Sequence, residues 1–533
     1  MAIQQTFDVV IVGGGPVGLG LAIELGQRGH TVALVERRRS PQPIPKGQNL
    51  TQRTVEHFHF WGCEPNLRAA RIMPPTVSSG GLVCYRTLLS GYHYDWLQRS
   101  KVRPYYFCDH ERLPQYATER VLRERAAQIE TISTFYGCTA TAIAQNQSGV
   151  EVDISESDGL RRSRTLRACY GVGCDGSRSM VRDESGISLT KSDHDRLMVL
   201  LVFRSTELHQ LLSHLPERSV YNVLHPDLAG YWRFFGRVDH GSEWFFHAPV
   251  PAGTTEDNFD FAGLLHAAVG RAFAHDITHI GFWDLRIAIA DSFRHGRIFI
   301  AGDAAHSHPP YGGFGINTGF EDARNLGWKL SATLRGWAGE KLLASYEAER
   351  RAVFASTARD FIEAFISEDR EFLSRYSPER NRAEFELAWR DRNASGKEVM
   401  TFEPHYEGSS VVFGSPAAQS SARGSHQFAA RAGHHLAPAT LSDGSDVYTR
   451  FGADLTLIAV DACESSVRDF RMAAEACGIP LTVIKDANAA MRDRYGARII
   501  LVRPDHFVAW AGNEAPCDIG AIIDRTVGAP YSY

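Results

Sequence analysis

A glycine-rich turn near the N-terminus has the residue types and the spacing that can bind a pyrophosphate. The segment Gly13–Gly18 reads Gly-Gly-Gly-Pro-Val-Gly and satisfies the pattern G-x-G-x-x-G. In this pattern Gly13 makes the tight turn, Gly15 lets phosphates approach the backbone, and Gly18 lets a helix pack closely on a strand. Free N–H groups and the dipole at the start of the following helix favour phosphate charge. This glycine turn therefore predicts a bound dinucleotide, with an ordinary strand-to-helix turn as the alternative.

An acidic residue follows the glycine turn at the distance that ribose binding requires. Glu36 ends the second expected strand, where its carboxylate can accept hydrogen bonds from the adenosine ribose. Three arginines come next, Arg37, Arg38 and Arg39, so the charges here do not exclude a dinucleotide that carries an adenosine 2′-phosphate. The first motif thus indicates a dinucleotide without identifying it.

A second chemical motif follows an apolar strand in the middle of the chain. The strand ends at Gly302 and Asp303, and a carboxylate at the end of a strand can bind sugar hydroxyls. Residues 308–317, here called the Pro–Gly loop, lead into a helix expected to start near Thr318. Three glycines let this loop lie flat against a planar ligand: Gly312, Gly313 and Gly315. Peptide N–H groups at the helix start could stabilise negative charge on that ligand, namely those of Gly315, Ile316 and Asn317.

The chain length and the patterning around these motifs indicate an α/β protein of three domains. At about 100–200 residues per domain, 533 residues suggest three. Phe7–Val12 reads as a buried parallel strand and Pro16–Arg28 as a helix. Residues 186–284 are rich in aromatic and β-branched residues and predict an inserted antiparallel sheet. From Glu321 to Tyr376 the pattern is helical, with a break near 336–339, and residues 404–425 read as a linker.

Composition and charge exclude several classes of protein. Charged residues make up 22% of the chain and the formal net charge is −5, which gives no electrostatic case for binding nucleic acid. The sequence has no run of 18 apolar residues, so we expect no membrane span, and its first residues do not resemble a signal peptide. Nine cysteines without a C-x-x-C pair argue against a disulfide framework or a metal site and favour a cytoplasmic protein.

Both motifs, together with a third, resemble those of a known family. Cys174–Ser179 reads Cys-Asp-Gly-Ser-Arg-Ser and is similar to the Asp-Gly motif of the group A flavoprotein monooxygenases, the para-hydroxybenzoate and phenol hydroxylase family. The Gly302–Asn317 stretch resembles the Gly-Asp motif of the same family, and all three motifs occur in the family's order. The resemblance covers about residues 7–360 and implies FAD as the cofactor and NADPH or NADH as the electron donor.

The resemblance also implies roles for individual residues. Arg53 looks like the family's arginine near the pyrophosphate, Gln115 like its flavin-contacting glutamine, and Pro310 like the proline beside the flavin's reactive edge. Asp175 would support both FAD and NAD(P)H. The complete predicted cofactor-binding set is Gly13, Gly15, Gly18, Glu36, Arg37, Arg53, Gln115, Asp175, Gly302, Asp303, Gly313, Gly315, Ile316 and Asn317.

The implied reaction is hydroxylation of a phenolic or heteroaromatic ring through a flavin C4a-hydroperoxide, with NAD(P)H and dioxygen as co-substrates. Epoxidation, oxidative decarboxylation or ring cleavage of a bulky natural product by the same fold is the alternative. A non-enzymatic flavin-binding protein is a third reading, against which the intact Pro–Gly loop argues.

Phenol hydroxylation usually requires a base, and the expected position does not supply one. Gln48 stands where some relatives place an Asp or His, and a glutamine can only orient a substrate or water. We therefore expect Gln48 and Pro310 to be the catalytic residues, with any base elsewhere. Candidates in the inserted sheet are Arg204, Tyr221, Tyr231, Arg233 and His247. Half of its aromatic residues should face the pocket, without the sequence indicating which: Trp232, Phe234, Trp244, Phe246 and Trp283.

The predicted architecture is a Rossmann-type FAD-binding domain (residues 1–185 and 285–400), an inserted antiparallel β-sheet substrate domain (186–284) and a C-terminal thioredoxin-like α/β domain (426–533). This last unit resembles the end of phenol and polyketide hydroxylases but lacks C-x-x-C, so structural packing or a homodimer surface is its expected role.

Overall fold

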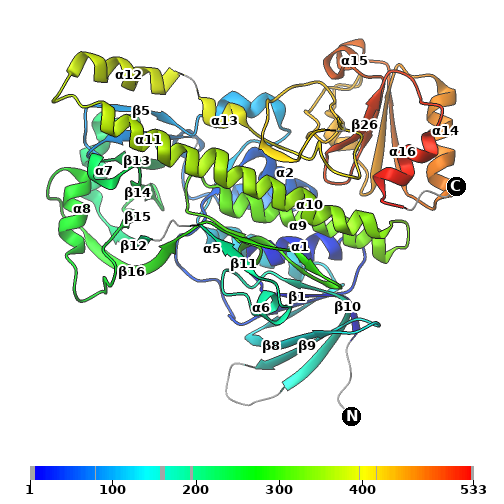
Figure 1. The fold of residues 1–533 in the computed structure, drawn as a ribbon, viewed down its shortest axis with the longest axis horizontal. Coiled ribbons are helices and arrows are strands. Elements are labelled where there is room, and N and C mark those ends of the chain that lie inside the picture. The colour runs from blue at the N-terminus through cyan, green and yellow to red at the C-terminus, as the bar shows by residue number, and fades with distance from the viewer. Residues whose placement is uncertain are drawn as a thin grey trace.

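The largest sheet of the molecule carries the glycine turn (Figure 1). The computed structural model describes residues 6–78, 80–156, 163–192, 196–394, 396–415 and 417–529. Strand β1 (Thr6–Val12), at the centre of this sheet, is buried on both faces, which explains its unbroken apolar sequence. Its residues Val9, Val10 and Ile11 are fully buried. The strand order is β18 (Arg294–His295), β19 (Ile298–Ile300), β10 (Ser163–Gly173), β1, β2 (Val32–Glu36) and β7 (Ile132–Tyr136), with the antiparallel β8 (Cys138–Gln145) and β9 (Val150–Glu156) attached to β10.

Three motif-bearing strands end at one edge of this sheet. Strands β1, β10 and β19 are parallel neighbours, so their carboxyl ends lie at the same edge. The glycine turn follows β1, Asp175 follows β10 and Gly302 follows β19. Helix α1 (Pro16–Gly26) begins at this edge and packs against α9 (Phe314–Leu334). The fold therefore brings the three predicted motifs together.

The second sheet lies beside the first and is larger than the sequence predicted. Its order is β16 (Asp276–Leu285), β12 (Arg196–Arg204), β15 (Glu243–Pro249), β14 (Trp232–Arg237), β13 (Val220–Leu224), β4 (Gly81–Tyr85) and β5 (His93–Trp96). The last two strands lie outside the predicted range 186–284, and β4 runs parallel to β13. A purely antiparallel sheet confined to that range is therefore too narrow a prediction, because pairing between distant segments leaves no local pattern.

The two faces of this second sheet pack against different partners. Trp232, Phe234 and Trp283 belong to an aromatic cluster that includes Tyr311 of the Pro–Gly loop. Two other aromatic residues pack on the opposite face, toward helix α8 (Phe261–Val269): Trp244 and Phe246. The first group therefore faces the loop that the sequence assigned to the flavin.

Long helices connect the two sheets. Helix α9 ends at Leu334 and α10 (Glu340–Thr357) begins after it, which confirms the predicted break at 336–339. Helix α9 starts at Phe314, one turn before the predicted Thr318, because the glycines of the loop obscure its helical periodicity. The π-helical turn η5 (Ala358–Glu363) leads into α11 (Ala364–Arg375), α12 (Arg382–Ala394) and α13 (Lys397–Thr401). The segment predicted as a linker contributes paired strands, β21 (Phe402–His405) and β22 (Ser421–Arg423), so that prediction was incomplete.

The C-terminal unit is a four-stranded mixed sheet between helices, drawn in orange and red in Figure 1. Its order is β24 (Leu481–Asp486), β23 (Leu455–Val460), β25 (Ile499–Val502) and β26 (Val508–Gly512), and only β23 and β24 are parallel. Helices α14 (Glu464–Ala476) and α16 (Ile519–Thr526) cover one face, and α15 (Ala489–Tyr495) covers the other. The likeness of residues 426–533 to thioredoxin stays a prediction.

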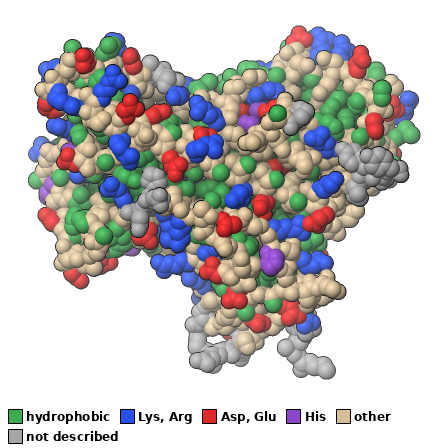
Figure 2. Space-filling view, viewed as in Figure 1, with side chains coloured by type: hydrophobic (Ala, Val, Ile, Leu, Met, Phe, Trp, Pro, Cys, Tyr) green, Lys and Arg blue, Asp and Glu red, His purple; other side chains and the backbone are tan. Residues whose placement is uncertain are grey.

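The surface shows charged side chains of both signs interspersed over the visible face (Figure 2). Among the described residues, no helix combines the length and the apolar character needed to cross a membrane.

Candidate functional site

Of the three motif glycines in the glycine turn, only Gly15 has free space where a side chain would begin. A Cβ atom on Gly13, whose φ is +107°, would lie 2.3 Å from the Cys174 carbonyl oxygen, and one on Gly18 would lie 1.9 Å from the Gly13 carbonyl oxygen. On Gly15 it would meet no described atom within 4 Å. Gly15 is also the N-cap of α1, which receives no side-chain cap from the described residues, so the first N–H groups of the helix are free. The turn thus fits a phosphate group at Gly15.

Glu36 is held beside this turn by two backbone groups. The Gly14 N–H donates to Oε2 at 2.8 Å and the Arg38 N–H donates to Oε1 at 2.8 Å. A carboxylate accepts about four hydrogen bonds, so both oxygens can still accept from ribose hydroxyls. Arg37 is exposed next to it.

Asp175 and Arg53 both have protein partners. Asp175 accepts from the Ser179 hydroxyl at 2.5 Å and from the Val181 N–H at 3.2 Å, which fixes the start of α6 (Met180–Glu184). Arg53, on α2 (Gln52–Phe60), donates to both oxygens of Glu321 and to the Asp505 carbonyl oxygen. A phosphate contact from Arg53 stays a prediction, and it would require exchange of one of these bonds.

Asp303 follows β19 at the edge where the three motif-bearing strands end. Its side chain is exposed, yet burial by the surrounding protein raises its pKa against the charges of His306 and Lys46. Lys46 is likewise exposed, and burial together with the Arg38 charge lowers its pKa. Asp303 and Lys46 thus influence each other's charge, and both are accessible to a ligand. Sequence reasoning missed Lys46 because it belongs to no motif.

The start of α9 provides a flat surface with free peptide N–H groups. Gly313 is its N-cap with φ +74°, and no described side chain caps the helix. The Asn317 side chain accepts from the Thr51 N–H at 2.9 Å and donates to the Asn49 carbonyl oxygen at 2.8 Å, which ties the loop to the preceding segment. Beside it lie Gly47, Ile316 and Gln115, since a Cβ on Gly47 would be 3.2 Å from Ile316 and 3.3 Å from Gln115 Oε1. The structure thus brings most of the predicted flavin-contacting residues together, and they fit a planar ring.

Gln48 is paired with a buried cation that the sequence did not indicate. Arg112 donates to Gln48 Oε1 at 2.9 Å and to the Arg237 carbonyl oxygen at 3.0 Å. Within the described ranges no carboxylate pairs with Arg112, and burial lowers its pKa to about 9. The Gln48 Nε2 group is buried and has no partner among the same residues. This arrangement orients Gln48 and leaves its amide N–H groups for a ligand or water.

An aromatic wall follows Pro310. The ring of Tyr311 lies 4.8 Å from Trp232 and 5.8 Å from Trp96, between centroids. Trp96 in turn lies 6.0 Å from Phe234. Between this wall and helices α11–α13 lies a pocket of about 170 Å³. Tyr311, the residue after Pro310, therefore lines a pocket that has aromatic side chains on one side and charged ones on the other, among them Asp369 and Glu398.

The candidate bases of the inserted sheet do not fit the role. Arg204 and Arg233 carry guanidinium groups, which stay protonated in proteins. Tyr221 packs on the far face with Trp244. His247 accepts a hydrogen bond from Trp283 at 3.2 Å, and burial with the Lys46 charge lowers its pKa to about 3. Tyr231 packs under the Arg196 guanidinium, 4.3 Å from its ring centre.

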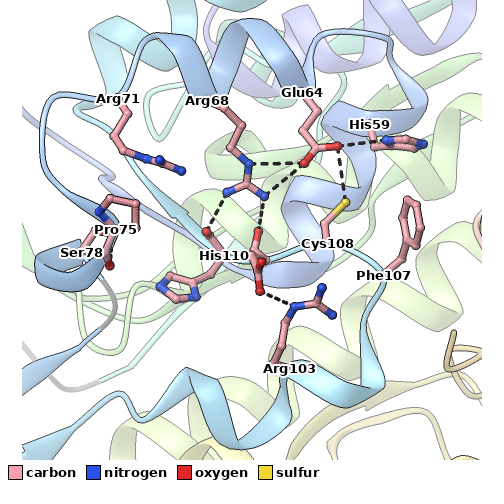
Figure 3. Close-up of a pocket in the computed structure, with 11 residues that line it drawn as sticks. His59, Glu64, Arg68, Arg71, Pro75, Ser78, Arg103, Phe107, Cys108 and His110 are labelled. Carbon is pink, nitrogen blue, oxygen red and sulfur yellow. Dashed lines mark hydrogen bonds and ion pairs between the residues drawn. The ribbon is translucent and has the colours of Figure 1, made fainter.

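A larger pocket, of about 520 Å³, has no residue of the Pro–Gly loop in its lining; Figure 3 shows its side chains. It is lined by α2, by α3 (Glu64–Ala69) and by residues 103–110, and its cations are paired: Arg68 donates to Glu64 and Glu111, and Arg103 to Asp109. Size alone therefore does not make it the active site, because its charged groups are already paired with one another and no residue of the Pro–Gly loop lines it.

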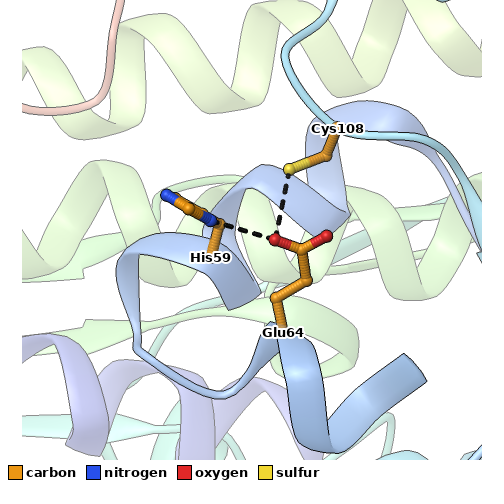
Figure 4. Close-up of side chains that lie close together, drawn as sticks. All are labelled: His59, Glu64 and Cys108. Atoms are coloured by element: carbon orange, nitrogen blue, oxygen red, sulfur yellow. Dashed lines mark hydrogen bonds and ion pairs between the residues drawn. The ribbon is translucent and has the colours of Figure 1, made fainter. Parts of the chain in front are cut away.

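Three side chains at the edge of this larger pocket could hold a metal ion (Figure 4). His59 Nδ1 lies 2.9 Å from the Glu64 carboxylate, and the Cys108 thiol lies 3.7 Å from it. Burial, with the charges of Glu56 and Glu64, raises the pKa of Cys108. A metal would have to displace the thiol proton and compete with Arg68 for Glu64. The expectation of no metal site stays a prediction.

Comparisons with known proteins agree with this geometry. Residues 6–360 match the family described as FAD binding domain, and residues 429–530 match the aromatic-ring hydroxylase C-terminal domain. The chain is 30% identical to a 4-methyl-5-nitrocatechol 5-monooxygenase of Burkholderia, over 98% of this chain and 97% of that protein. It is 30% identical to a putative polyketide hydroxylase of Streptomyces halstedii, over 95% and 93%. The solved structure of RebC with bound 7-carboxy-K252c superposes with a TM-score of 0.84 at 27% identity and covers 99% of this chain and 100% of that chain.

The motifs, the open glycine turn and these matches agree on the chemistry. The protein is an enzyme that uses FAD, NAD(P)H and dioxygen to hydroxylate an aromatic compound. The chain belongs to the FAD-dependent aromatic-ring hydroxylases.

Proposed function

We propose that the substrate, or the part of it that reacts, is a single phenolic ring bound in the 170 Å³ pocket beside Tyr311. An apolar cavity of about 150 Å³ holds one benzene molecule, so this pocket matches one substituted six-membered ring. The Burkholderia relative carries the name of a one-ring nitrocatechol substrate and matches over nearly the whole chain. The volume of the pocket and the four aromatic side chains in its otherwise largely polar lining carry the proposal: Tyr94, Trp96, Tyr311 and Phe365.

The residues described above would hold FAD along the edge where β1, β10 and β19 end. The open backbone at Gly15 would receive the pyrophosphate, Glu36 the adenosine ribose, and Asp303 the ribityl hydroxyls. The free N–H groups at the start of α9 would offset negative charge at the edge of the ring. When bound, FAD supplies electron transfer from NAD(P)H to dioxygen and the transfer of one oxygen atom to the substrate.

The protein's remaining tasks are to orient the substrate and to exclude water. Trp96 and Tyr311 would form the wall that excludes water on this side, with Trp232 packed against Tyr311. Pro310 would set the height of the substrate ring against the cofactor, and Gln48 would orient the substrate or a water through its unpaired amide. Neither residue can take a proton at neutral pH.

The proposal extends to the setting of the protein. None of the nine cysteines, all within the described ranges, forms a disulfide, which suits a reducing cytoplasm. A homodimer through the C-terminal unit is also proposed, and sedimentation velocity of the purified protein tests it.

A substrate screen tests the function. Phenol, catechols, nitrocatechols and tetracyclic quinones would be compared for stimulated NADPH and NADH oxidation, with ¹⁸O₂ used to trace the added oxygen. We expect one-ring catechols to stimulate oxidation and to gain one ¹⁸O per NAD(P)H consumed. Stimulation by the tetracyclic compounds alone would contradict the single-ring proposal. Because epoxidation and oxygen-insertion ring cleavage consume the same NAD(P)H and dioxygen per oxygen atom, the structure of the product, determined by mass and NMR, separates them from hydroxylation.

A further inference from the structure

We propose that Glu398 is the base that takes the proton from a ring hydroxyl of the substrate, at the polar end of the pocket beside Tyr311. This inference rests on the proposed single-ring phenolic substrate. It assigns the base that neither Gln48 nor the inserted sheet supplies.

Glu398 lies directly against the Pro–Gly loop. It stands on α13, and a Cβ atom on Gly312 would be 3.0 Å from its Oε1 atom. Its Oε2 atom accepts a hydrogen bond from the Trp96 indole at 2.8 Å. Within the part of the chain that the structure describes, Oε1 has no hydrogen-bond partner. One oxygen is therefore fixed and the other is free to accept a proton next to the residues that follow Pro310.

A second unpaired group lines the same pocket. Asn222, on β13 across from α13, is 1% exposed, and its amide oxygen has no partner among the described residues. Leaving a buried amide without a hydrogen bond costs roughly 1–3 kcal/mol, so such a group marks the place of a ligand or a bound water. The Glu398 carboxylate and the Asn222 amide thus offer two polar contacts to one ring between aromatic walls.

The charges around Glu398 suit a base that works near neutral pH. Burial raises its pKa to about 7, the Trp96 hydrogen bond and the Arg99 charge oppose this rise, and the Asp369 charge adds to it. A carboxylate of that basicity is half ionised near physiological pH, where general bases are most effective. The charged and titratable groups around it are Arg99 of η1 (Arg99–Tyr105), Asp369 of α11 with its partner Arg392 of α12, Tyr94 of β5 and Tyr311 of the loop. Three further charged residues line the same pocket: Asp95 of β5, Glu368 of α11 and Lys397 of α13.

The proposed step is a single proton transfer. The O–H bond of the substrate breaks, its electron pair stays on the ring oxygen, and the proton forms a new O–H bond with Glu398 Oε1. The negative charge moves from the carboxylate to the ring oxygen, so the net charge of the pocket is unchanged. The ionised ring is richer in electrons and reacts more readily with an electrophilic oxygen.

The test compares Glu398→Gln with Trp96→Phe in the FAD-loaded enzyme, using catechol and the more acidic 4-nitrocatechol as probes. For wild type we expect kcat with catechol to rise as the pH passes through about 7, because the base must be ionised. Glu398→Gln should lower kcat with catechol about 100-fold and remove this inflection. With 4-nitrocatechol above its own ionisation pH, the loss should be threefold or less. Trp96→Phe keeps the carboxylate but removes a bond that stabilises its ionised form, so the inflection should move to higher pH.

A readout without turnover separates this inference from the proposed function. The visible absorption of bound 4-nitrocatechol reports its ionisation. At pH 7, where Glu398 is half ionised and can accept the proton, a larger share of the bound probe should be ionised in wild type than in Glu398→Gln. An ionised bound probe that is not hydroxylated would support the base and contradict the proposed function. Equal losses with both probes, or the same bound spectrum in both proteins, would overturn the assignment of Glu398.

Discussion

Two regions of the molecule bury charged side chains, and they differ in how completely those charges are paired. At the junction of the first sheet's helices with the C-terminal unit, Glu349 of α10 accepts hydrogen bonds from Arg503 and Lys329 at 2.7–2.9 Å. Asn325 and Ser409 donate to it as well, at 2.7 and 2.6 Å. The junction is closed around Glu349 in the sense that each oxygen of this carboxylate has at least two donors among the described residues.

The pocket beside the Pro–Gly loop is the opposite case. Glu398 receives one hydrogen bond, and the described residues offer no partner to the Asn222 amide oxygen. At Gln48, outside the lining of this pocket, the Nε2 group likewise has no described partner, and the Arg112 guanidinium beside it is buried with no carboxylate that the structure describes. Because unpaired buried polar groups are costly, a protein retains them where a ligand completes them. The contrast teaches that pairing, more than burial, separates structural charges from those of a site.

The largest expected effect of a single change is at the junction. Glu349→Gln leaves Lys329 and Arg503 buried with too little negative charge, and we expect a loss of about 3–5 kcal/mol in the free energy of unfolding. Denaturant unfolding measures it. The matched control is Glu156→Gln in the exposed pair with Arg164, where we expect about 0.5 kcal/mol or less. Equal losses in the two variants would remove the distinction between closed and open regions.

The junction should also give a defined acid response. Burial alone would raise the pKa of Glu349, but the charges of Arg503 and Lys329 and their hydrogen bonds hold it below its ordinary value. A carboxyl group with a lowered pKa stabilises the fold above its ordinary value of about 4.5, and this contribution is lost as the pH falls toward the folded-state pKa. The free energy of unfolding should therefore fall less between pH 7 and pH 3 in Glu349→Gln than in wild type. An equal fall in the two proteins would contradict this.

Alanine substitutions at two glycines of the glycine turn should have effects of intermediate size, and they compare a packed position with an open one. Gly18→Ala places a Cβ 1.9 Å from the Gly13 carbonyl oxygen, and we expect a loss of about 2–3 kcal/mol in stability of the apoprotein. Gly15→Ala fills open space at a φ of −74°, so apoprotein stability should hardly change while FAD binding weakens about tenfold, or about 1.4 kcal/mol. Thermal unfolding and fluorescence titration with FAD measure the two effects. A destabilised Gly15→Ala apoprotein would show that this position is packed.

The smallest expected effect is at Gln48. Gln48→Ala removes an oriented amide but no titrating group, because Arg112 holds its oxygen at 2.9 Å. The share of NAD(P)H electrons that ends in hydrogen peroxide should rise about twofold, with the pH profile of the rate unchanged. Peroxide and hydroxylated product are measured in the same reaction. A shifted pH profile would instead give Gln48 a part in proton transfer.

The sequence was sufficient to predict the site residues that directly follow a parallel strand. The glycine turn, Asp175 and Gly302 each end a parallel strand, so their meeting at one edge could be predicted from local patterns. Glu398 could not, because α13 reaches the loop only through the turns after α11 and α12, and no motif marks it. The parallel pairing of β4 with β13, which places Asn222 in the pocket, depends on contacts between distant segments. Arg112 was missed for the same reason: only the fold shows that a lone cation is buried beside Gln48.

Amide hydrogen exchange on the FAD-loaded protein, with and without 4-nitrocatechol, compares the open and the closed region in one measurement. We predict that the probe increases protection in residues 81–98, 310–317 and 396–401 and leaves residues 503–507 of the junction unchanged. Added protection confined to the junction, or to residues 59–78 and 103–110 around the larger pocket, would show that the unpaired groups beside Tyr311 do not mark the substrate site.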